Sequence, residues 1–199
     1  MGELPAHRVN DQYRFNRAEL LEWVTSRKTT RKLNPEIFQE SDKESLQNLV
    51  DTLRRGGIFH KVQGSDKNSV LRNIVSTILL PKEVNRDLLL QILLAREALG
   101  STAIGDGIAI PHPRNPIVLR VPISSVTLCF LESPIDFAAL DGQKVHALFT
   151  IIAPTVKEHL HLLSRLAFVV RDAAVKTLIL RQAPGEEILE AFARLEPNP

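Results

Sequence analysis

Two histidines and one arginine stand out because imidazole and guanidinium groups can together handle a phosphoryl group. His112 lies between Pro111 and Pro113, which stiffen the chain and bias the histidine towards extended backbone. A neutral imidazole nitrogen can attack phosphorus and carry a labile phosphoryl group. His159 could donate a hydrogen bond to that group, and Arg96 could pair with its oxygens in a bidentate manner. These three residues are therefore the candidate catalytic residues.

A loop between Arg96 and His112 could complete an anion-binding site. Its glycines permit positive φ and close backbone approach: Gly100, Gly105 and Gly107. The hydroxyls of Ser101 and Thr102, with nearby backbone N–H groups, are candidate phosphate ligands. The glycine spacing matches neither the nucleotide phosphate loop nor the dinucleotide fingerprint. An ordinary loop remains an alternative, as does a role for His112 as a strand cap with one backbone hydrogen bond.

The other histidines and the cysteine do not indicate a second site. His159 and His161 are two positions apart on a predicted helix and point to different faces, which argues against a zinc pair. We expect His159 to point inward and His161 to point to solvent. His146 lies in an apolar strand and is interpreted as structural, and Cys129 as a buried, inert thiol. A single cysteine excludes a disulfide framework and a Cys-rich zinc site, and no metal site is expected.

Hydrophobic periodicity predicts the elements that position these residues. Helical spacing and N-cap residues predict helices over 41–56, 65–79, 85–99, 157–170, 173–182 and 186–195. Apolar, β-rich runs predict strands over 108–110, 126–130 and 145–152. Helices flanking a small sheet define an α/β sandwich. Because helix and strand do not alternate strictly, we predict a mixed β-sheet.

Residues 1–35 differ in composition from the rest of the chain. They hold seven Lys and Arg against four Asp and Glu, which suggests a boundary near their end. Loose alternation predicts a β-hairpin with a turn at 10–11, followed by a helix over about 17–25. So short a segment cannot bury a core of its own. We therefore expect a short N-terminal hairpin and helix appended to a larger domain.

The composition excludes several classes of protein. The chain has 199 residues, with 25 Lys and Arg against 23 Asp and Glu. This balance excludes a strongly basic protein that coats nucleic acid. Hydrophobic residues make up 44% and charged residues 24%, as in ordinary globular proteins. No apolar run approaches the ~18 residues of a membrane-spanning helix, and the N-terminus lacks the apolar stretch of a signal peptide. We expect a soluble cytoplasmic protein without membrane insertion.

Three motifs carry a family resemblance: Arg96-Glu97 with Gly100-Ser101-Thr102-Ala103-Ile104-Gly105, then Gly107-Ile108-Ala109-Ile110-Pro111-His112, and His159-Leu160 with Leu163-Ser164 and Leu166-Ala167. On these motifs, residues from about 42 to 195 resemble the enzyme IIA domain of the fructose/mannitol/nitrogen-regulatory class of the bacterial phosphotransferase system (PTS). The resemblance implies that His112 is the phosphorylated histidine. It also implies that His159 is the second active-site histidine and that Arg96 is the arginine opening the Gly-Ser-Thr segment. The fold of the family agrees with the α/β sandwich.

The resemblance also implies partners. An HPr-like phosphocarrier protein would donate the phosphoryl group, an enzyme IIB or a regulatory target would accept it, and no metal or organic cofactor would take part. We predict a PTS enzyme IIA-like phosphoryl-carrier domain over 40–196, which makes the chain a phosphotransferase. Since no transporter segment or enzyme IIB domain is fused to it, a regulatory, nitrogen-type role is favoured over sugar transport. A homodimer is compatible with the sequence. Retention of the three candidate catalytic residues weighs against a degenerate binding module.

The first 25 residues show a second resemblance, carried by residues 2–9, 13–15 and 17–24. They are similar to the end of excisionase-type, MerR-like winged-helix DNA-binding domains, where the corresponding residues form the wing and its following helix. The helix-turn-helix that should precede them is absent, so residues 1–35 are interpreted as a partial domain. We expect DNA binding only if the missing N-terminal part is present. The alternative function is a DNA-binding transcription regulator with a sensory or dimerising enzyme IIA-like domain. A solvated basic appendage is the third interpretation.

Overall fold

The computed structural model describes residues 7–9, 12–14, 46–82 and 84–196, and the chain divides into two compact units, Met1–Leu46 and Gln47–Pro199. In the first unit, β1 (His7–Val9) pairs antiparallel with β2 (Gln12–Arg14). These are the two strands of the predicted hairpin. Its turn and the helix predicted over 17–25 lie outside the described residues.

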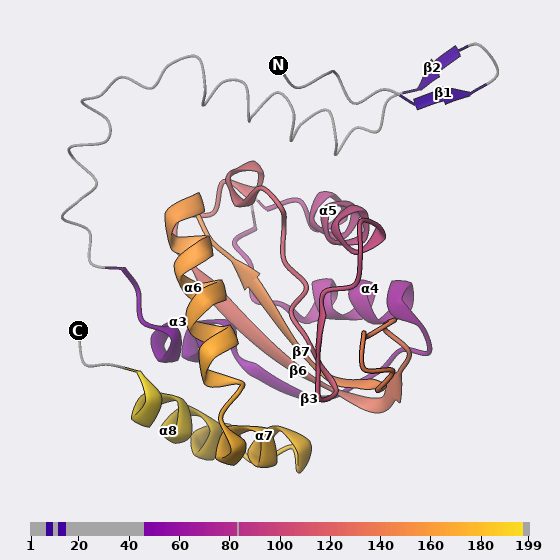
Figure 1. The fold of residues 1–199 in the computed structure, drawn as a ribbon. Coiled ribbons are helices and arrows are strands. Elements are labelled where there is room, and N and C mark those ends of the chain that lie inside the picture. The colour runs from indigo at the N-terminus through magenta and orange to yellow at the C-terminus, as the bar shows by residue number, and fades with distance from the viewer. Residues whose placement is uncertain (1–6, 10–11, 15–45, 83, 197–199) are drawn as a thin grey trace. The chain divides into compact units, whose positions relative to one another are not determined.

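The second unit is built on a five-stranded mixed sheet (Figure 1) with the order β3-β6-β7-β5-β4. The strands are β3 (Ile58–Val62), β4 (Ala103–Gly105), β5 (Ile108–Ala109), β6 (Ser125–Ile135) and β7 (Val145–Ile152). The central pair β6 and β7 is antiparallel, β3 runs parallel to β6, and β5 runs parallel to β7. The short β4 is antiparallel to β5. The prediction of a mixed sheet is confirmed.

Both edge strands, β3 and β4, are absent from the sequence prediction. β3 carries the exposed His60 and Lys61, and Lys61 has a φ of 57° where the register against β6 shifts. An irregular edge strand with charged residues lacks the apolar run of a central strand. β4 has only three residues, and none of them is buried. Neither segment therefore carries the periodic signal from which the central strands are predicted.

The second unit contains six described α-helices, and five of them match the predicted ranges to within two residues at each end. The six are α3 (Leu49–Gly56), α4 (Lys67–Thr77), α5 (Arg86–Ala98), α6 (Val156–Val169), α7 (Ala173–Leu180) and α8 (Gly185–Leu195). The helix predicted over 41–56 begins only at Leu49, because residues 46–48 are not helical and Asn48 is its N-cap. Five of the six helices have an N-cap side chain that accepts a backbone N–H of the first turn: Asn48, Asp66, Asn85, Thr155 and Asp172. The capping residues proposed near Ser41 lie outside the described part. No helix among the described residues is both long and apolar enough to cross a membrane.

The helices form a layer on each face of the sheet (Figure 1), with α4 and α5 on one face and α3, α6, α7 and α8 on the other. Alternate residues of β6 divide between the two layers. Val126, Leu128 and Phe130 belong to the core that includes α3, α6, α7 and α8. Cys129 is fully buried on the opposite face, so both faces of the strand are covered. This sandwich holds the loop after β5 next to the first turns of α6.

Candidate active site

His112 lies three residues after β5, and its ring is held by the backbone. Its Nδ1 is 2.7 Å from the carbonyl oxygen of Ile110. A carbonyl oxygen only accepts hydrogen bonds, so Nδ1 carries the proton of the neutral ring. The lone pair is then on Nε2. The alternative role of His112, as a strand cap, requires one backbone hydrogen bond. That bond is present, but it uses only Nδ1 and leaves Nε2 available as a nucleophile.

His159 lies in the first half of α6 and faces His112. The two ring centroids are 5.3 Å apart and the planes are inclined by 43°. The side chain of His159 is only 4% exposed, which confirms that it points inward. Its Nδ1 is buried without a hydrogen-bond partner among the described residues. His161 is half-buried, so the expectation that it lies open to solvent is only partly met.

The pKa values of both imidazoles are displaced downward. Burial lowers the pKa of His159 to about 4, and the neighbouring His112 adds to the effect. Burial is also the main cause that lowers the pKa of His112, and the positive charge of Arg96 lowers it further. The hydrogen bond to Ile110 and the negative charge of Glu97 act in the opposite direction and raise this pKa. Both rings are therefore neutral at neutral pH. An unprotonated nitrogen is what attack on phosphorus requires.

The lowered pKa of His159 predicts how stability depends on pH. Between the usual histidine pKa of 6.5 and about 4, the unfolded chain binds a proton at this position and the folded chain does not. The free energy of unfolding therefore falls as the pH drops through this window. We expect His159 to contribute a loss of about 2 to 3 kcal/mol between pH 7 and about pH 4.5.

Chemical denaturation of the wild type and of His159→Gln at the two pH values measures this contribution. The variant is expected to lose less stability on acidification than the wild type, since glutamine does not titrate. Equal losses in both proteins would show that His159 is not the group that is held neutral.

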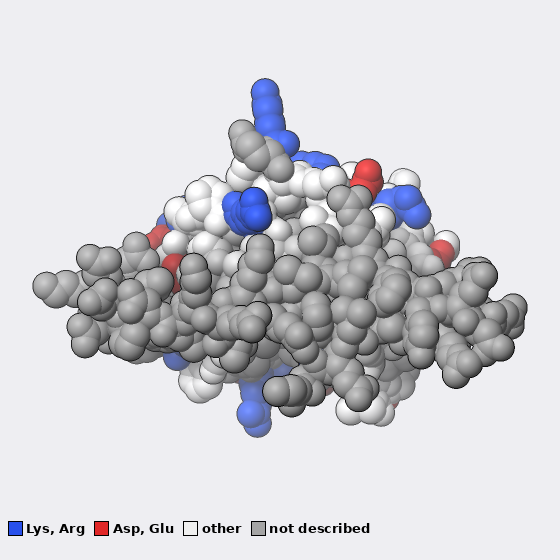
Figure 2. All heavy atoms as spheres, turned by 90° about the horizontal axis from the view of Figure 1, so that it is seen from above, with Lys and Arg blue, Asp and Glu red and all other residues white. Residues whose placement is uncertain are grey.

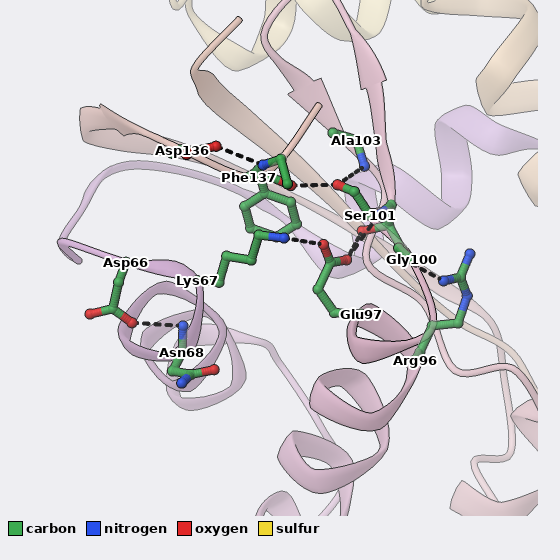
Figure 3. Close-up of polar contacts among 12 residues, drawn as sticks. Asp66, Lys67, Asn68, Arg96, Glu97, Gly100, Ser101, Ala103, Asp136 and Phe137 are labelled. Atoms are coloured by element: carbon green, nitrogen blue, oxygen red, sulfur yellow. Dashed lines mark hydrogen bonds and ion pairs between the residues drawn. The ribbon is translucent and has the colours of Figure 1, made fainter. Parts of the chain in front are cut away.

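Arg96 lies in the last turn of α5, at the start of the glycine loop (Figure 3). Its Nη1 donates to the carbonyl oxygen of Gly100 at 3.0 Å, which holds the side chain against the loop. No ion pair joins it to a carboxylate in the described part of the chain, and its charge acts on the pKa of His112. The remaining N–H groups of its guanidinium are thus available to oxygens of an anion.

The hydroxyls of Ser101 and Thr102 both have protein acceptors. Ser101 Oγ donates to the carbonyl oxygen of Phe137 and accepts from the amide of Ala103 at 3.2 Å. Thr102 Oγ1 is buried and donates to Glu97 Oε2 at 2.7 Å. A hydroxyl has one proton to donate, so either side chain would have to rotate to donate to a phosphate. Their role as phosphate ligands stays a prediction.

Glu97 is a buried charge whose contribution the sequence reasoning missed. Its side chain is 8% exposed and binds both Thr102 and, through Oε1, the Nζ of Lys67 at 3.1 Å. A signal was present in the sequence, because Glu97 follows Leu89 and Leu93 at intervals of four on the buried side of α5. A carboxylate at an apolar position of a helix needs a partner, and here it has two.

The remaining reactive side chains lie apart from this pair of histidines. Cys129 is fully buried and burial raises the pKa of its thiol to about 12, which confirms an inert thiol. His146 lies on β7 against Gly107, and its Nε2 is buried without a partner among the described residues. Within the same residues, no three His, Cys, Asp or Glu side chains gather as metal ligands.

The comparison with protein families decides what this pair of histidines belongs to. Residues 51–194 match the family described as "Phosphoenolpyruvate-dependent sugar phosphotransferase system, EIIA 2". The chain belongs to this family. Enzymes IIA of the phosphotransferase system transfer phosphoryl groups through a histidine, so this chain is a phosphotransferase component. They take the group from HPr-like carriers and pass it to enzyme IIB or to regulatory partners.

Individual relatives of this enzyme IIA agree with the family match. A "Nitrogen regulatory protein" of Pseudomonas aeruginosa is 40% identical over 145 residues, covering 71% of this chain and 91% of that protein. The protein of the same name from Escherichia coli K12 is 31% identical and covers 76% and 93%. The crystal structure of the nitrogen regulatory protein IIA-Ntr from Neisseria meningitidis superposes with a TM-score of 0.63 at 25% identity, covering 72% of this chain and 98% of that one.

Proposed function

We propose that His112 of this enzyme IIA accepts the phosphoryl group on Nε2. The observation that carries the proposal is the hydrogen bond between Nδ1 and the carbonyl oxygen of Ile110. It selects the tautomer with a lone pair on Nε2 and prevents rotation of the ring away from the site. His159 has no comparable bond at its Nδ1 within the described residues.

The transfer step follows from this tautomer. The lone pair of His112 Nε2 attacks the phosphorus of the phosphohistidine on the donor, while the donor's P–N bond breaks and its electron pair returns to the donor nitrogen. If the donor ring carries a proton on its other nitrogen, it leaves as neutral imidazole. The His112 ring then becomes a phospho-imidazolium whose Nδ1–H still donates to Ile110. No proton needs to leave His112 during the transfer.

Arg96 and His159 are proposed to stabilise the group in transit. The guanidinium can pair with two phosphoryl oxygens, as Arg does with phosphates elsewhere. His159 can donate one ring N–H, and the negative charge on a bound phosphoryl group would raise its pKa from about 4 and favour a second donor. Both act on charge that the transferring group brings into a half-buried site.

The relatives favour a regulatory, nitrogen-type enzyme IIA over one committed to sugar import. Two relatives that are 31 to 40% identical are called nitrogen regulatory proteins and match this chain over nearly their full length. We propose that an HPr-like carrier donates to this chain and that the acceptor is a regulatory target or an enzyme IIB. The oligomeric state, including a homodimer, stays a prediction.

Incubation of the full chain with enzyme I, HPr and phosphoenolpyruvate tests the proposal. We expect one acid-labile, base-stable phosphoryl group per chain, which intact-mass analysis after quenching at high pH would detect. The control omits HPr, and the chain should then remain unmodified. A chain that stays unmodified in the complete mixture would overturn the proposed function.

DNA binding remains an alternative for the first unit only. The strands β1 and β2 are compatible with a wing. In Figure 2, described Lys and Arg side chains appear at several separate places on the face in view. A gel shift with promoter DNA at low and high salt distinguishes the alternatives. Salt-sensitive retardation would support DNA binding, and none would leave phosphoryl transfer as the function.

A further inference from the structure

We infer that Glu97 is a positioning residue for the nucleophile, acting with Lys67 through a continuous chain of hydrogen bonds that ends at His112 Nδ1. The inference rests on the proposed role of His112. It concerns how the loop after α5, which leads to His112, holds one imidazole in a single orientation.

The chain of hydrogen bonds can be followed from α4 to the imidazole. Lys67 Nζ donates to Glu97 Oε1 at 3.1 Å, and Glu97 Oε2 accepts from both the amide and the hydroxyl of Thr102 at 2.9 and 2.7 Å. The carbonyl oxygen of Thr102 accepts the amide of Ile110 at 3.0 Å. The carbonyl oxygen of Ile110 accepts His112 Nδ1–H at 2.7 Å. The first three steps join α4, the end of α5, the loop that follows it and the residue after β5, and the last step is local to the His112 loop.

Figure 3 shows the anchored end of this chain. The Lys67 side chain extends from α4 towards the end of α5 and meets the carboxylate of Glu97 there. Its Nζ also lies 5.1 Å from the centre of the Phe137 ring, and the carbonyl oxygen of Phe137 accepts the hydroxyl of Ser101. Two successive loop residues, Ser101 and Thr102, are thus fixed by groups from other segments. A loop held at both positions can transmit its geometry to the strand pairing that follows.

Burial and charge explain why the anchor is a carboxylate. Hydrogen bonds to an ionised oxygen are shorter and about twice as strong as those between neutral groups. Glu97 is 8% exposed, so its charge needs compensation, which the half-buried Lys67 provides. The same compensation matters for the reaction, because an unpaired carboxylate near His112 would repel the incoming phosphoryl group. Lys67 therefore allows a negative anchor in a site that must receive an anion.

The substitution Glu97→Gln tests the inference, because it keeps the shape and one acceptor but loses the charge and places an NH₂ group towards Lys67. In the full chain we expect the single-turnover rate of phosphoryl uptake from phosphorylated HPr to fall by ~10- to 100-fold, the loss typical of misplacing a reacting group by about 1 Å. The half-saturating donor concentration should stay unchanged. In ¹⁵N NMR of labelled histidine, the His112 ring should change from one tautomer to a mixture of both.

Glu196→Gln is the matched control. Glu196 also accepts from two protein donors, the amides of Leu49 and Val50, but it lies at the N-terminus of α3 without a link to His112. A merely structural role for Glu97 predicts that both variants lose stability and leave the tautomer unchanged. We expect Glu196→Gln to keep the wild-type rate of transfer and the single tautomer.

Lys67→Met keeps the inference testable if Glu97→Gln does not fold, since Lys67 is only half-buried. It should show the same changes in smaller measure, with a rate loss of ~3- to 10-fold. A single His112 tautomer in every variant, or equal rates for Glu97→Gln and Glu196→Gln, would overturn the inference. The NMR measurement needs no phosphoryl donor. A wild-type chain that takes no phosphoryl group but shows a Glu97-dependent tautomer would therefore contradict the proposed function alone.

Discussion

His112→Gln is expected to abolish phosphoryl uptake, with a loss of about a thousandfold or more, because it removes the nucleophile itself. Glutamine is close to the imidazole in size, and position 112 is only half-buried. The fold should therefore be retained. The rate of acid-labile phosphate incorporation from phosphorylated HPr, with a matched circular dichroism spectrum, measures the effect.

Two other histidine variants separate the nucleophile from its surroundings. His159→Gln should still take up phosphate, but more slowly by ~10- to 100-fold, because glutamine cannot take up the proton that a bound phosphoryl group favours on this ring. His161→Gln, on the half-buried side of the same helix, should react at the wild-type rate. If His112→Gln incorporates phosphate while His159→Gln does not, the roles of the two rings in the proposal are reversed.

Gly107→Ala is expected to destabilise the fold by about 3 kcal/mol or more, because it combines backbone strain with a clash. Gly107 has a φ of 72°, and a Cβ there would lie 2.2 Å from Nδ1 of the His146 ring. The carbonyl oxygen of Gly107 also accepts the amides of His146 and Ala147, so the residue cannot move without disturbing the junction of β5 and β7. Urea unfolding of the full chain measures the change, and phosphoryl uptake should fall with it because His112 follows β5.

Gly142→Ala provides the matched control for this prediction. Gly142 has a nearly identical φ of 70°, but a Cβ there would meet nothing within 4 Å. It should therefore show the strain of the left-handed backbone alone, about 1 kcal/mol. The difference between the two variants measures the clash with His146. Equal costs would show that the ring of His146 moves aside freely.

Much of the central fold could be predicted because its signals are local. Apolar periodicity and N-cap side chains such as Asn85 and Asp172 mark most helix boundaries within one or two residues. The exception is α3, for which the sequence predicts a start at residue 41 and which begins at Leu49. β7 and the first seven residues of β6 lie in the buried centre of the sheet and therefore appear as apolar runs, whereas the exposed residues 132–134 of β6 are not part of the predicted strand. The edge strands lack that burial. β3 carries exposed polar residues and β4 is a three-residue pairing within a glycine loop.

The candidate site, too, could be predicted from the sequence only in part. Residue types and the prolines around His112 indicate a nucleophile, and helical position indicates that His159 points inward. The separation of 5.3 Å between their rings depends on how α6 packs beside the loop after β5, which is a tertiary property. The tautomer of His112 depends on the position of one backbone carbonyl group. The partnership of Glu97 with Lys67 joins residues 30 positions apart, so no local pattern reveals it.

The position of the phosphorus on the protein tests the central claim most directly. The sample is the full chain, labelled with ¹⁵N at histidine and phosphorylated through HPr. Two-dimensional NMR then correlates each ring nitrogen with its protons and with phosphorus. We predict a single P–N bond at Nε2 of His112, with a proton retained on Nδ1. Phosphorus on Nδ1 of His112, or on His159, would contradict the account.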